Sequence, residues 1–315
     1  MKILVIMTGG TIGSAVKDGW ITNDVAAKSK LFGKVANSSI EFTVSTPYTI
    51  LSENLSANEL NLLQDEIIRN IKSGYDGLIV THGTDTLLYS AVAAEYAANT
   101  ADIPVLFVSS DYPLEDARAN GYANFEAAVA FIKEKAGTGV FVAYKNTCDK
   151  HTNIHIPSHI LKHNELNADI HSTHNIPYAV FSSGVITKSD KSIANSNVHG
   201  KVHYLDNSGI LVIDSHPGDN FSYSLKGTRA VIFMPYHSAT LNTANKNFQM
   251  FCEKAKEKQI PLFTLSRNAD TAYETTKIYS ELGIHALPYG TFVSAYMKIW
   301  AAISLKENIF DFINK

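Results

Sequence analysis

Short runs of apolar residues, each followed directly by a polar turn, recur along the first half of the chain. Residues 3–6 (Ile-Leu-Val-Ile) are rich in β-branched side chains, which is typical of a strand buried on both faces. Similar runs cover residues 78–81, 104–108 and 139–143. Segments with helical character lie between several of these runs. Strands that alternate with helices predict a parallel, doubly wound sheet.

One helix start is marked by a capping box. Ser56 and Glu59 form the pattern Ser-x-x-Glu, in which each side chain satisfies a free backbone amide of the first turn. Further helices are expected over residues 86–99 and 115–135. The apolar positions that follow the box at helical spacing are Leu60, Leu63, Ile67 and Ile71.

The second half of the chain repeats the α/β pattern after a polar interruption. Residues 188–208 are rich in Ser, Asn, Asp and Lys and lack a clear period, so we expect a linker there. A chain of 315 residues is long for one core. We therefore expect an N-terminal domain at 1–187 and a C-terminal domain at 209–315, with a helix near 272–282 in the latter. Its expected strands cover 210–213, 230–233 and 261–264.

Composition narrows the class of protein. The formal net charge of -3 gives no basic footprint for nucleic acid. No apolar run approaches the length that spans a membrane, and Met1 runs into the first strand without the features of a signal peptide. Cys148 and Cys252 lie far apart and lack metal spacing, which fits a reducing compartment, with a single disulfide as the alternative. We expect a cytoplasmic protein.

The glycine-rich turn after the first strand does not match the common phosphate-binding patterns. Its glycines stand at 9, 10 and 13, whereas the dinucleotide fingerprint requires G-x-G-x-x-G. No Gly-Lys-Ser/Thr follows, so the phosphate-loop pattern also fails. The alternative to a catalytic role is that these residues only form a turn.

Two strands end in turns that carry hydroxyl groups, Thr8-Gly-Gly-Thr11 and Thr81-His-Gly-Thr-Asp-Thr86. In a parallel sheet both turns open at the same edge, so Thr11, Thr84 and Asp85 can converge there. A threonine hydroxyl is a weak nucleophile that needs a base and donors for an oxyanion. Backbone amides of a glycine-rich turn can donate, and a desolvated lysine can act as the base.

The histidines are weaker candidates. His82 directly follows a buried strand, where packing or a structural hydrogen bond is the more common role. His151, His155 and His159 step by four residues, but Pro157 between them argues against one helix. We therefore expect no metal site at these histidines, and the leading hypothesis given below involves neither a metal nor an organic cofactor.

Together the two turns, extended to Gly13 in the first, resemble the signature motifs of the L-asparaginase/glutaminase family, the threonine-nucleophile amidohydrolases. The resemblance implies a larger N-terminal flavodoxin-like parallel sheet with helices on both faces and a smaller C-terminal Rossmann-like α/β domain. Further segments that resemble the family are Ser52-Glu53, Asp116-Ala-Arg-Ala-Asn120, Pro235-Tyr-His-Ser-Ala-Thr240 and Met297-Lys-Ile-Trp300.

The resemblance also implies roles for individual residues. Thr11 matches the nucleophile that attacks the side-chain amide carbon of the substrate and forms an acyl-enzyme. Thr84, Asp85 and a lysine match a second triad that assists proton transfer and the attacking water. Lys162 is the best match for that lysine, and a solvated surface lysine is the alternative interpretation. The positions that match the family's substrate-binding residues are Ser52, Glu53, Thr84 and Asp85.

Two departures from the family pattern concern activity. The family usually places an activating tyrosine on the mobile loop after the first motif, whereas no tyrosine occurs between residues 14 and 47 here. Trp20 lies in that stretch but has no ionisable hydroxyl. Either another group activates Thr11, or turnover is slow, or the substrate is unusual. Glu53 stands where many relatives carry glutamine, which bears on substrate preference.

The leading hypothesis is hydrolysis of L-asparagine to L-aspartate and ammonia, with L-glutamine as a further substrate to be tested. Because the family completes each site with a neighbouring subunit, the resemblance implies a homodimer or homotetramer. A related amidohydrolase or an amidotransferase subunit is the alternative, although the latter would carry an N-terminal module and the first strand starts at residue 2. A non-catalytic amino-acid sensor is a third hypothesis.

Overall fold

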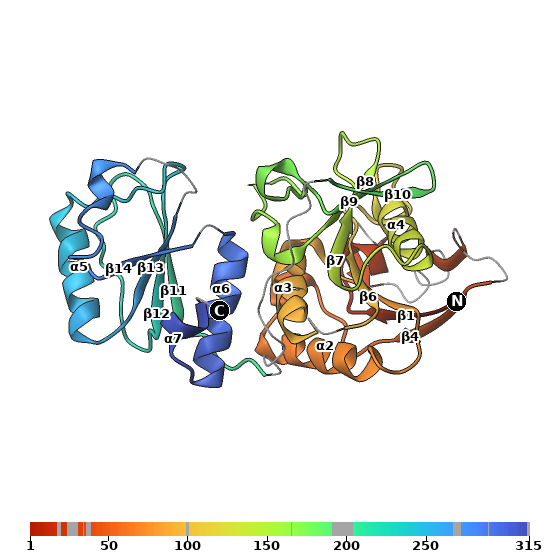
Figure 1. The fold of residues 1–315 in the computed structure, drawn as a ribbon, viewed down its shortest axis with the longest axis horizontal. Coiled ribbons are helices and arrows are strands. Elements are labelled where there is room, and N and C mark those ends of the chain that lie inside the picture. Colours follow the sequence, from red (N-terminus) through yellow and green to blue (C-terminus); the bar gives the residue numbers. More distant parts are fainter. Residues whose placement is uncertain are drawn as a thin grey trace. The chain divides into compact units, whose positions relative to one another are not determined.

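The chain forms two compact units in the computed structural model, residues 1–204 and 205–315, which are described one at a time (Figure 1). Residues 191–203, which belong to the expected linker at 188–208, lie outside the described residues. The structure describes residues 1–17, 20–23, 31–33, 35, 39–98, 101–164, 166–190, 204–266, 272–288 and 290–313, without the side chains of 15–17 and 20–23.

The N-terminal unit is built on an eight-stranded sheet of order β10-β9-β8-β7-β6-β5-β1-β4, with β2 and β3 paired as a separate hairpin. The five strands β4, β1, β5, β6 and β7 are parallel, in the flavodoxin-like order. In chain order the strands are β1 (Lys2–Met7), β2 (Ser14–Lys17), β3 (Trp20–Asn23), β4 (Glu41–Ser45), β5 (Gly77–Thr81), β6 (Pro104–Val108), β7 (Gly139–Tyr144), β8 (Thr152–His155), β9 (Ala179–Ser182) and β10 (Val185–Lys188).

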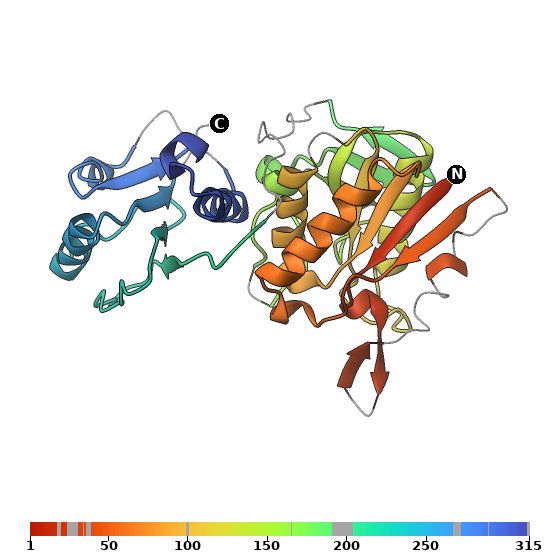
Figure 2. The ribbon, with the colours of Figure 1, turned by 90° about the horizontal axis from the view of Figure 1, so that it is seen from below.

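Helices cover both faces of this sheet, with α2 and α3 on one face and α4 on the other (Figures 1 and 2). α2 starts at the predicted capping box, because the Ser56 and Glu59 side chains both bond backbone amides of the first turn. The helices that lie entirely within the described residues of this unit are α2 (Ala57–Asn70), α3 (Leu87–Ala97) and α4 (Gly121–Lys133). Short 3-10 helices are η1 (Thr11–Gly13), η2 (Ser52–Asn54), η3 (Thr84–Thr86), η4 (Pro157–His159) and η5 (Thr173–Asn175).

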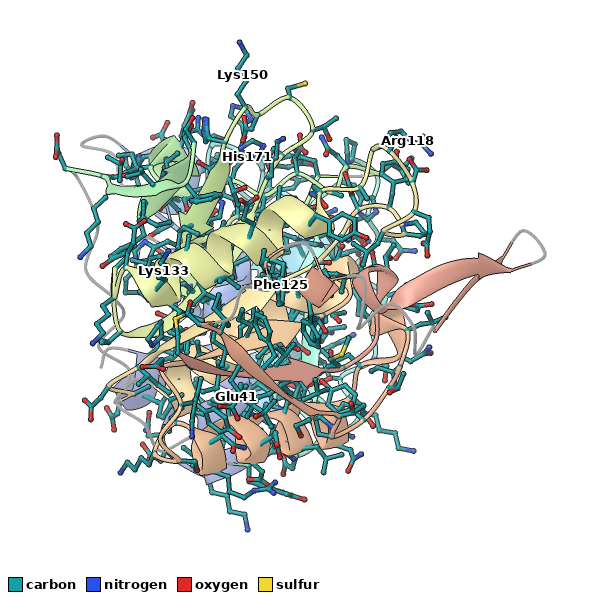
Figure 3. The ribbon with its side chains drawn as sticks, turned by 90° about the vertical axis from the view of Figure 1, so that its right-hand side faces the viewer. Glu41, Arg118, Phe125, Lys133, Lys150 and His171 are labelled. Atoms are coloured by element: carbon teal, nitrogen blue, oxygen red, sulfur yellow. The ribbon has the colours of Figure 1, made fainter. Side chains whose placement is uncertain are left out.

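One part of the core of this unit lies between α4 and the parallel strands. Phe125 of α4, labelled in Figure 3, is fully buried and its ring centroid lies 5.9 Å from that of Phe42 in β4. The strands β1, β5, β6 and β7 are buried along nearly their whole length. This burial on both faces explains why they are continuous apolar runs in the sequence.

The C-terminal unit has a smaller parallel sheet of order β11-β12-β13-β14. Phe233 of β12 packs against Phe248 and Phe251 of α5. The helix expected near 272–282 is wrong, since the described part of that stretch forms only a 3-10 helix and turns; two adjacent threonines disfavour a helix. The elements are β11 (Ile210–Asp214), β12 (Ala230–Met234), α5 (Lys246–Glu257), β13 (Leu262–Leu265), η6 (Glu274–Thr276), β14 (Ile284–Leu287), α6 (Phe292–Leu305) and α7 (Ile309–Ile313).

Among the described residues, no helix combines the length and the hydrophobicity needed to cross a lipid bilayer. Cys148 is an exposed free cysteine and Cys252 is a buried free cysteine.

Candidate active site

The turn after β1 needs glycine because its backbone passes directly against the second motif. Gly10 has a φ of 77°, a conformation that residues with a side chain rarely adopt. A Cβ on Gly10 would lie 2.3 Å from the backbone nitrogen of Gly83. Thr11 follows as the first residue of η1 and is half-buried. The first motif therefore places its threonine beside the turn of the second motif.

The second motif is packed in turn against the loop after β4. A Cβ on Gly83 would lie 2.4 Å from the Cβ of Ser52, so no larger residue fits between the two segments. The hydroxyl of Thr86 donates a hydrogen bond of 2.8 Å to the Ser52 carbonyl. Ser52 is buried, whereas Glu53 is exposed. The Ser52–Glu53 pair thus lies beside the second motif.

Both threonine turns begin where the strand order of the sheet reverses. β1 lies between β5 on one side and β4 on the other, and Met7 at the end of β1 is level with Thr81 at the end of β5. In open α/β sheets, the crevice beyond the carboxyl ends at such a reversal is where ligands bind. The fold therefore places Thr11 and Thr84 at the edge that suits a ligand site.

The hydroxyl of Thr84 is held by the turn that follows the next strand. Its Oγ1 lies 2.6 Å from the Oγ of Ser109 and donates a 3.2 Å hydrogen bond to the carbonyl of Ser110. Asp85 beside it is exposed. Ser109 and Ser110 directly follow β6 and are missing from the sequence-based site. Thr84 was identified as a hydroxyl in the turn that follows a buried strand. The same rule, applied to the turn after β6, would have identified Ser109 and Ser110.

His82 is a buried, hydrogen-bonded residue that stabilises the turn after β5. It is 2% exposed, its Nδ1–H donates to the carbonyl of Gly83 at 2.9 Å, and its Nε2 accepts from the hydroxyl of Ser90 at 2.9 Å. Loss of hydration in this buried position lowers the pKa of His82 to about 4. The ring is therefore neutral at pH 7, with both nitrogens engaged in holding the turn after β5.

Lys162 precedes His163, which contacts the second motif at Thr84. The Nε2 of His163 lies 3.3 Å from the carbonyl oxygen of Thr84, and its Nδ1 lies 3.3 Å from the carbonyl oxygen of Asp169. Lys162 itself is exposed. His163 is a contact that sequence reasoning missed, since 79 residues separate it from Thr84.

Tyr48 is the first tyrosine after the loop that lacks one, and it lies just before the bridge between Gly9 and Ile50. Its hydroxyl is buried, and burial raises the pKa of Tyr48 well above its usual value. A phenolate is disfavoured at neutral pH, so Tyr48 is a poor candidate for the base that activates Thr11.

The hairpin β2–β3 starts directly after η1 and projects from the N-terminal unit (Figures 2 and 3). It belongs to the stretch 14–39, which lies between η1 and β4. Residues 18–19, 24–30, 34 and 36–38 of that stretch lie outside the described residues.

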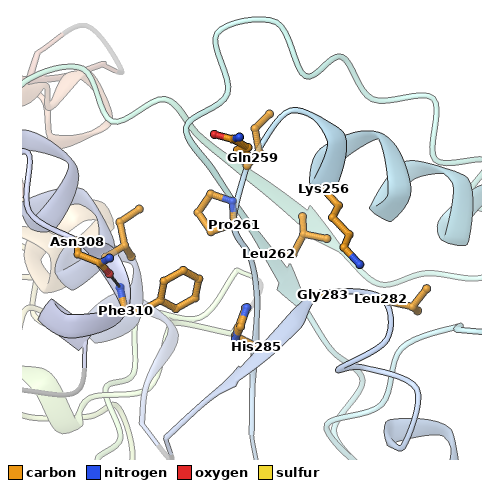
Figure 4. Close-up of a pocket in the computed structure, with 11 residues that line it drawn as sticks. Lys256, Gln259, Pro261, Leu262, Leu282, Gly283, His285, Asn308 and Phe310 are labelled. Atoms are coloured by element: carbon orange, nitrogen blue, oxygen red, sulfur yellow. Dashed lines mark hydrogen bonds between the residues drawn. The ribbon is translucent and has the colours of Figure 1, made fainter.

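A separate cavity of about 440 Å³ lies in the C-terminal unit (Figure 4). Leu262 of β13, His285 of β14 and Phe310 of α7 are among its lining residues, and none of the sequence-predicted site residues contributes to it. Within the described parts of the chain, no three histidine, cysteine or acidic side chains are grouped so that they could hold a metal ion.

Comparison with known proteins agrees with this geometry. The family model described as Asparaginase, N-terminal, matches residues 2–192, which contain both threonine motifs and the reversal of strand order. This chain belongs to the asparaginase family. The prediction made from the two motifs is thereby confirmed at the level of the family.

Solved L-asparaginases share the asparaginase fold of this chain. The thermostable L-asparaginase from Thermococcus kodakarensis matches with a TM-score of 0.81 at 19% identity, over 100% of this chain and 96% of that one. A probable cytoplasmic L-asparaginase from Campylobacter jejuni matches with a TM-score of 0.77 at 20% identity, over 99% and 98% of the two chains. The predicted two-domain fold is confirmed, and at these identities the likeness concerns the fold alone.

Curated relatives within the family carry a different name, that of a glutamyl-tRNA(Gln) amidotransferase subunit. The relative from Methanosarcina acetivorans is 33% identical over 165 residues, and the one from Haloquadratum walsbyi is 31% identical over 190 residues. The matches cover 49% and 54% of this chain but 37% and 39% of the relatives. The chain thus matches less than half the length of these relatives.

Proposed function

We propose that this chain is an amidohydrolase that converts L-asparagine and water to L-aspartate and ammonia. The observation that carries the proposal is the double contact of Gly10 with Gly83 and of Gly83 with Ser52. It joins three segments that are distant in sequence at the sheet edge where α/β proteins bind ligands. Each of these segments carries a residue that matches a family position, namely Thr11, Thr84 or Ser52.

In the first proposed step, the Oγ of Thr11 forms a bond to the side-chain amide carbon of asparagine. The hydroxyl proton is transferred to the amide nitrogen, the C–N bond breaks, and ammonia leaves an ester on Thr11. In the second step, water adds to the ester carbon, gives its proton to the threonine oxygen and releases aspartate. Thr84 and Lys162 assist these proton transfers, as the members of the second triad that the family resemblance implies.

The substrate's charged groups suggest roles for the remaining residues. The carboxylates of Asp85 and Glu53 are exposed and can attract the α-ammonium group. The hydroxyl of Ser52 can donate to the α-carboxylate. Asparagine and glutamine differ by one methylene, which a pocket distinguishes by about 1–3 kcal/mol.

The test is ammonia release from L-asparagine and from L-glutamine, measured with wild type and with Thr11→Val. We expect release with at least one of the two amides, and a fall of about 10³-fold or more in the folded variant. Ammonia release that persists in Thr11→Val would refute the role of Thr11. If wild type releases none but binds aspartate in a calorimeter, an amino-acid sensor is favoured instead.

A tRNA-dependent amidotransferase subunit is the second candidate, favoured by the identity of about one third to the amidotransferase relatives. The same ammonia assay, run with and without glutamyl-tRNA(Gln), separates the two functions. Full turnover of asparagine without the tRNA supports the asparaginase. Sedimentation of the same preparation tests the proposed homodimer or homotetramer.

A further inference from the structure

A buried carboxylate on α3 holds the segment that leads to Lys162. Glu95 is 3% exposed, and helix α3 around it is buried on nearly every side. Its Oε2 accepts a hydrogen bond of 2.8 Å from the backbone N–H of Ser158, and its Oε1 accepts one of 2.9 Å from the Ser158 hydroxyl. Because a charge removed from water is costly, a carboxylate in this place needs such donors and fixes the segment that supplies them.

Residues 158–163, which we call the strap, start within the 3-10 helix η4 and continue as an irregular segment. The strap's first residue, Ser158, is bonded to Glu95 near the carboxyl end of α3, and its last residue, His163, reaches the carbonyl of Thr84 just before α3. Between these two ends η4 is in contact with α3, so the strap is tied to this helix near its carboxyl end and to the turn just before its start.

The strap is also held on its other side. The backbone N–H of Leu161 donates to the carbonyl of His171 at 2.9 Å, and Ile160 pairs with Ser172 in an antiparallel bridge. Ile160 is fully buried, whereas Lys162 is exposed. Lys162, whose side chain reaches solvent, thus lies between the bonded backbone of Leu161 and the imidazole of His163 that contacts Thr84.

We propose that Glu95 is a positioning residue for Lys162. It fixes Ser158 and thereby sets the register of the strap on α3, so that Lys162 and His163 stay at the turn that carries Thr84. The inference rests on the proposed function, in which Lys162 assists proton transfer. It gives a positioning role to the buried Glu95, which lies ten residues after Asp85 in the sequence.

The first test compares two substitutions at the same position. Glu95→Leu removes both hydrogen bonds. Glu95→Gln can keep both, because its carbonyl oxygen accepts from the Ser158 N–H while its amide donates to the Ser158 hydroxyl. We expect Glu95→Leu to lower kcat for asparagine about tenfold or more with KM changed by less than about twofold, and Glu95→Gln to restore most of kcat. Equal kcat values for the two variants would overturn the proposal.

Two further variants test whether the fall in kcat of Glu95→Leu reflects only a general loss of stability. Leu63→Ala on α2 removes a buried side chain of the same unit away from the strap and should lower thermal stability while kcat stays within about twofold. Ser158→Ala removes only the hydroxyl bond and should lower kcat by about threefold in a protein that still folds. A loss of kcat in Leu63→Ala as large as in Glu95→Leu would contradict a specific role.

A double-mutant cycle tests whether Glu95 acts through Lys162. In a Lys162→Met background, Glu95→Leu should cause no further fall in kcat. An undiminished tenfold fall in that background would overturn the proposal.

Hydrogen exchange tests the strap independently of activity. If wild type releases no ammonia, the proposed function fails, but the hydrogen-exchange test of the strap still applies. The Leu161 amide should exchange at least about tenfold faster in Glu95→Leu than in Leu63→Ala, and equal rates would refute the tether.

Discussion

In both units, parallel strands run directly into turns that carry hydroxyl groups, yet the hydroxyls find different partners. In the N-terminal unit, Thr84 after β5 contacts Ser109 after β6, so the bond joins the ends of two strands. In the C-terminal unit, Ser238 and Thr240 after β12 lie 2.9 Å apart within one turn. The same residue types thus cross-link separate segments in one unit and stabilise a local turn in the other.

Strand order explains this difference. The chain leaves β1 for β4 on one side and returns to β5 on the other, which creates a reversal at β1. The order β11-β12-β13-β14 follows the chain without a reversal. Because ligand crevices in open α/β sheets form at reversals, a hydroxyl turn is informative about function mainly when it lies at one.

The largest expected effect comes from the glycine that brings the turns together. Gly10→Ala should lower the free energy of unfolding by about 3–4 kcal/mol, since a left-handed φ and a backbone clash with Gly83 both oppose the new Cβ. Gly218→Ala in the C-terminal unit is the matched control, because Gly218 has a φ of 82° with open space around it. We expect a loss there of about 1 kcal/mol. Equal losses in urea titrations would show that the contact with Gly83 adds nothing.

The two hydroxyl pairs, Thr84 with Ser109 and Ser238 with Thr240, can be compared by the effect of a substitution in each on kcat. Thr84→Val should lower kcat for the proposed amide hydrolysis by about 10²–10³-fold, because the hydroxyl proposed to assist proton transfer is lost. Thr240→Val removes a hydroxyl of the other pair and should leave kcat within about twofold. Steady-state ammonia release measures both variants. A comparable fall in the two would mean that the reversal of strand order does not distinguish the pairs.

Acid should weaken the N-terminal unit through its buried imidazoles. Among the described residues, the histidines with a lowered pKa are His82, at about 4, and His155, at about 3, both mainly because burial removes hydration. The unfolded chain takes up these protons near pH 6.5, before the folded chain does. Stability is therefore complete above about pH 6.5 and is lost as the pH falls toward the folded pKa.

For His82 alone the loss at pH 5 amounts to about 2 kcal/mol relative to pH 8. Urea unfolding of wild type and of His82→Asn at the two pH values measures it. The variant should be less stable at pH 8 but show a smaller decrease on acidification. An identical decrease in both proteins would show that His82 does not carry the acid sensitivity.

Local signals in the sequence were sufficient for the elements that carry the candidate site. The apolar runs ending at Met7 and Thr81 are buried strands, and the Ser56 capping box starts a helix as expected. Each of these features is encoded within a few neighbouring residues. The family resemblance then selected Thr11 and Thr84 from among many hydroxyls.

The parts that were missed depend on tertiary contacts or on weak patterns. β8 and β10 are only four residues long, and β10 is mostly exposed, so they lack the continuous apolar run of a central strand. The contact of His163 with Thr84 joins residues 79 positions apart, and the bond of Ser158 to Glu95 joins residues 63 positions apart. No spacing rule in the sequence could reveal these pairs.

The smallest expected effect concerns the bond that fixes Ser52. Thr86→Val removes the hydrogen bond to the Ser52 carbonyl, which links η3 to η2. If Ser52 holds the substrate's carboxylate, its displacement should cost about 1 kcal/mol of binding, or about a fivefold rise in KM, with kcat nearly unchanged. Thr276→Val is the matched control, because its hydroxyl donates a 2.7 Å bond to Tyr273 within one exposed turn of the C-terminal unit. A bond between distant segments orients a second element, whereas a bond within a turn affects only that turn, so KM should stay constant in the control. A rise in KM for both variants, or for neither, would remove the distinction between cross-linking and local hydroxyls.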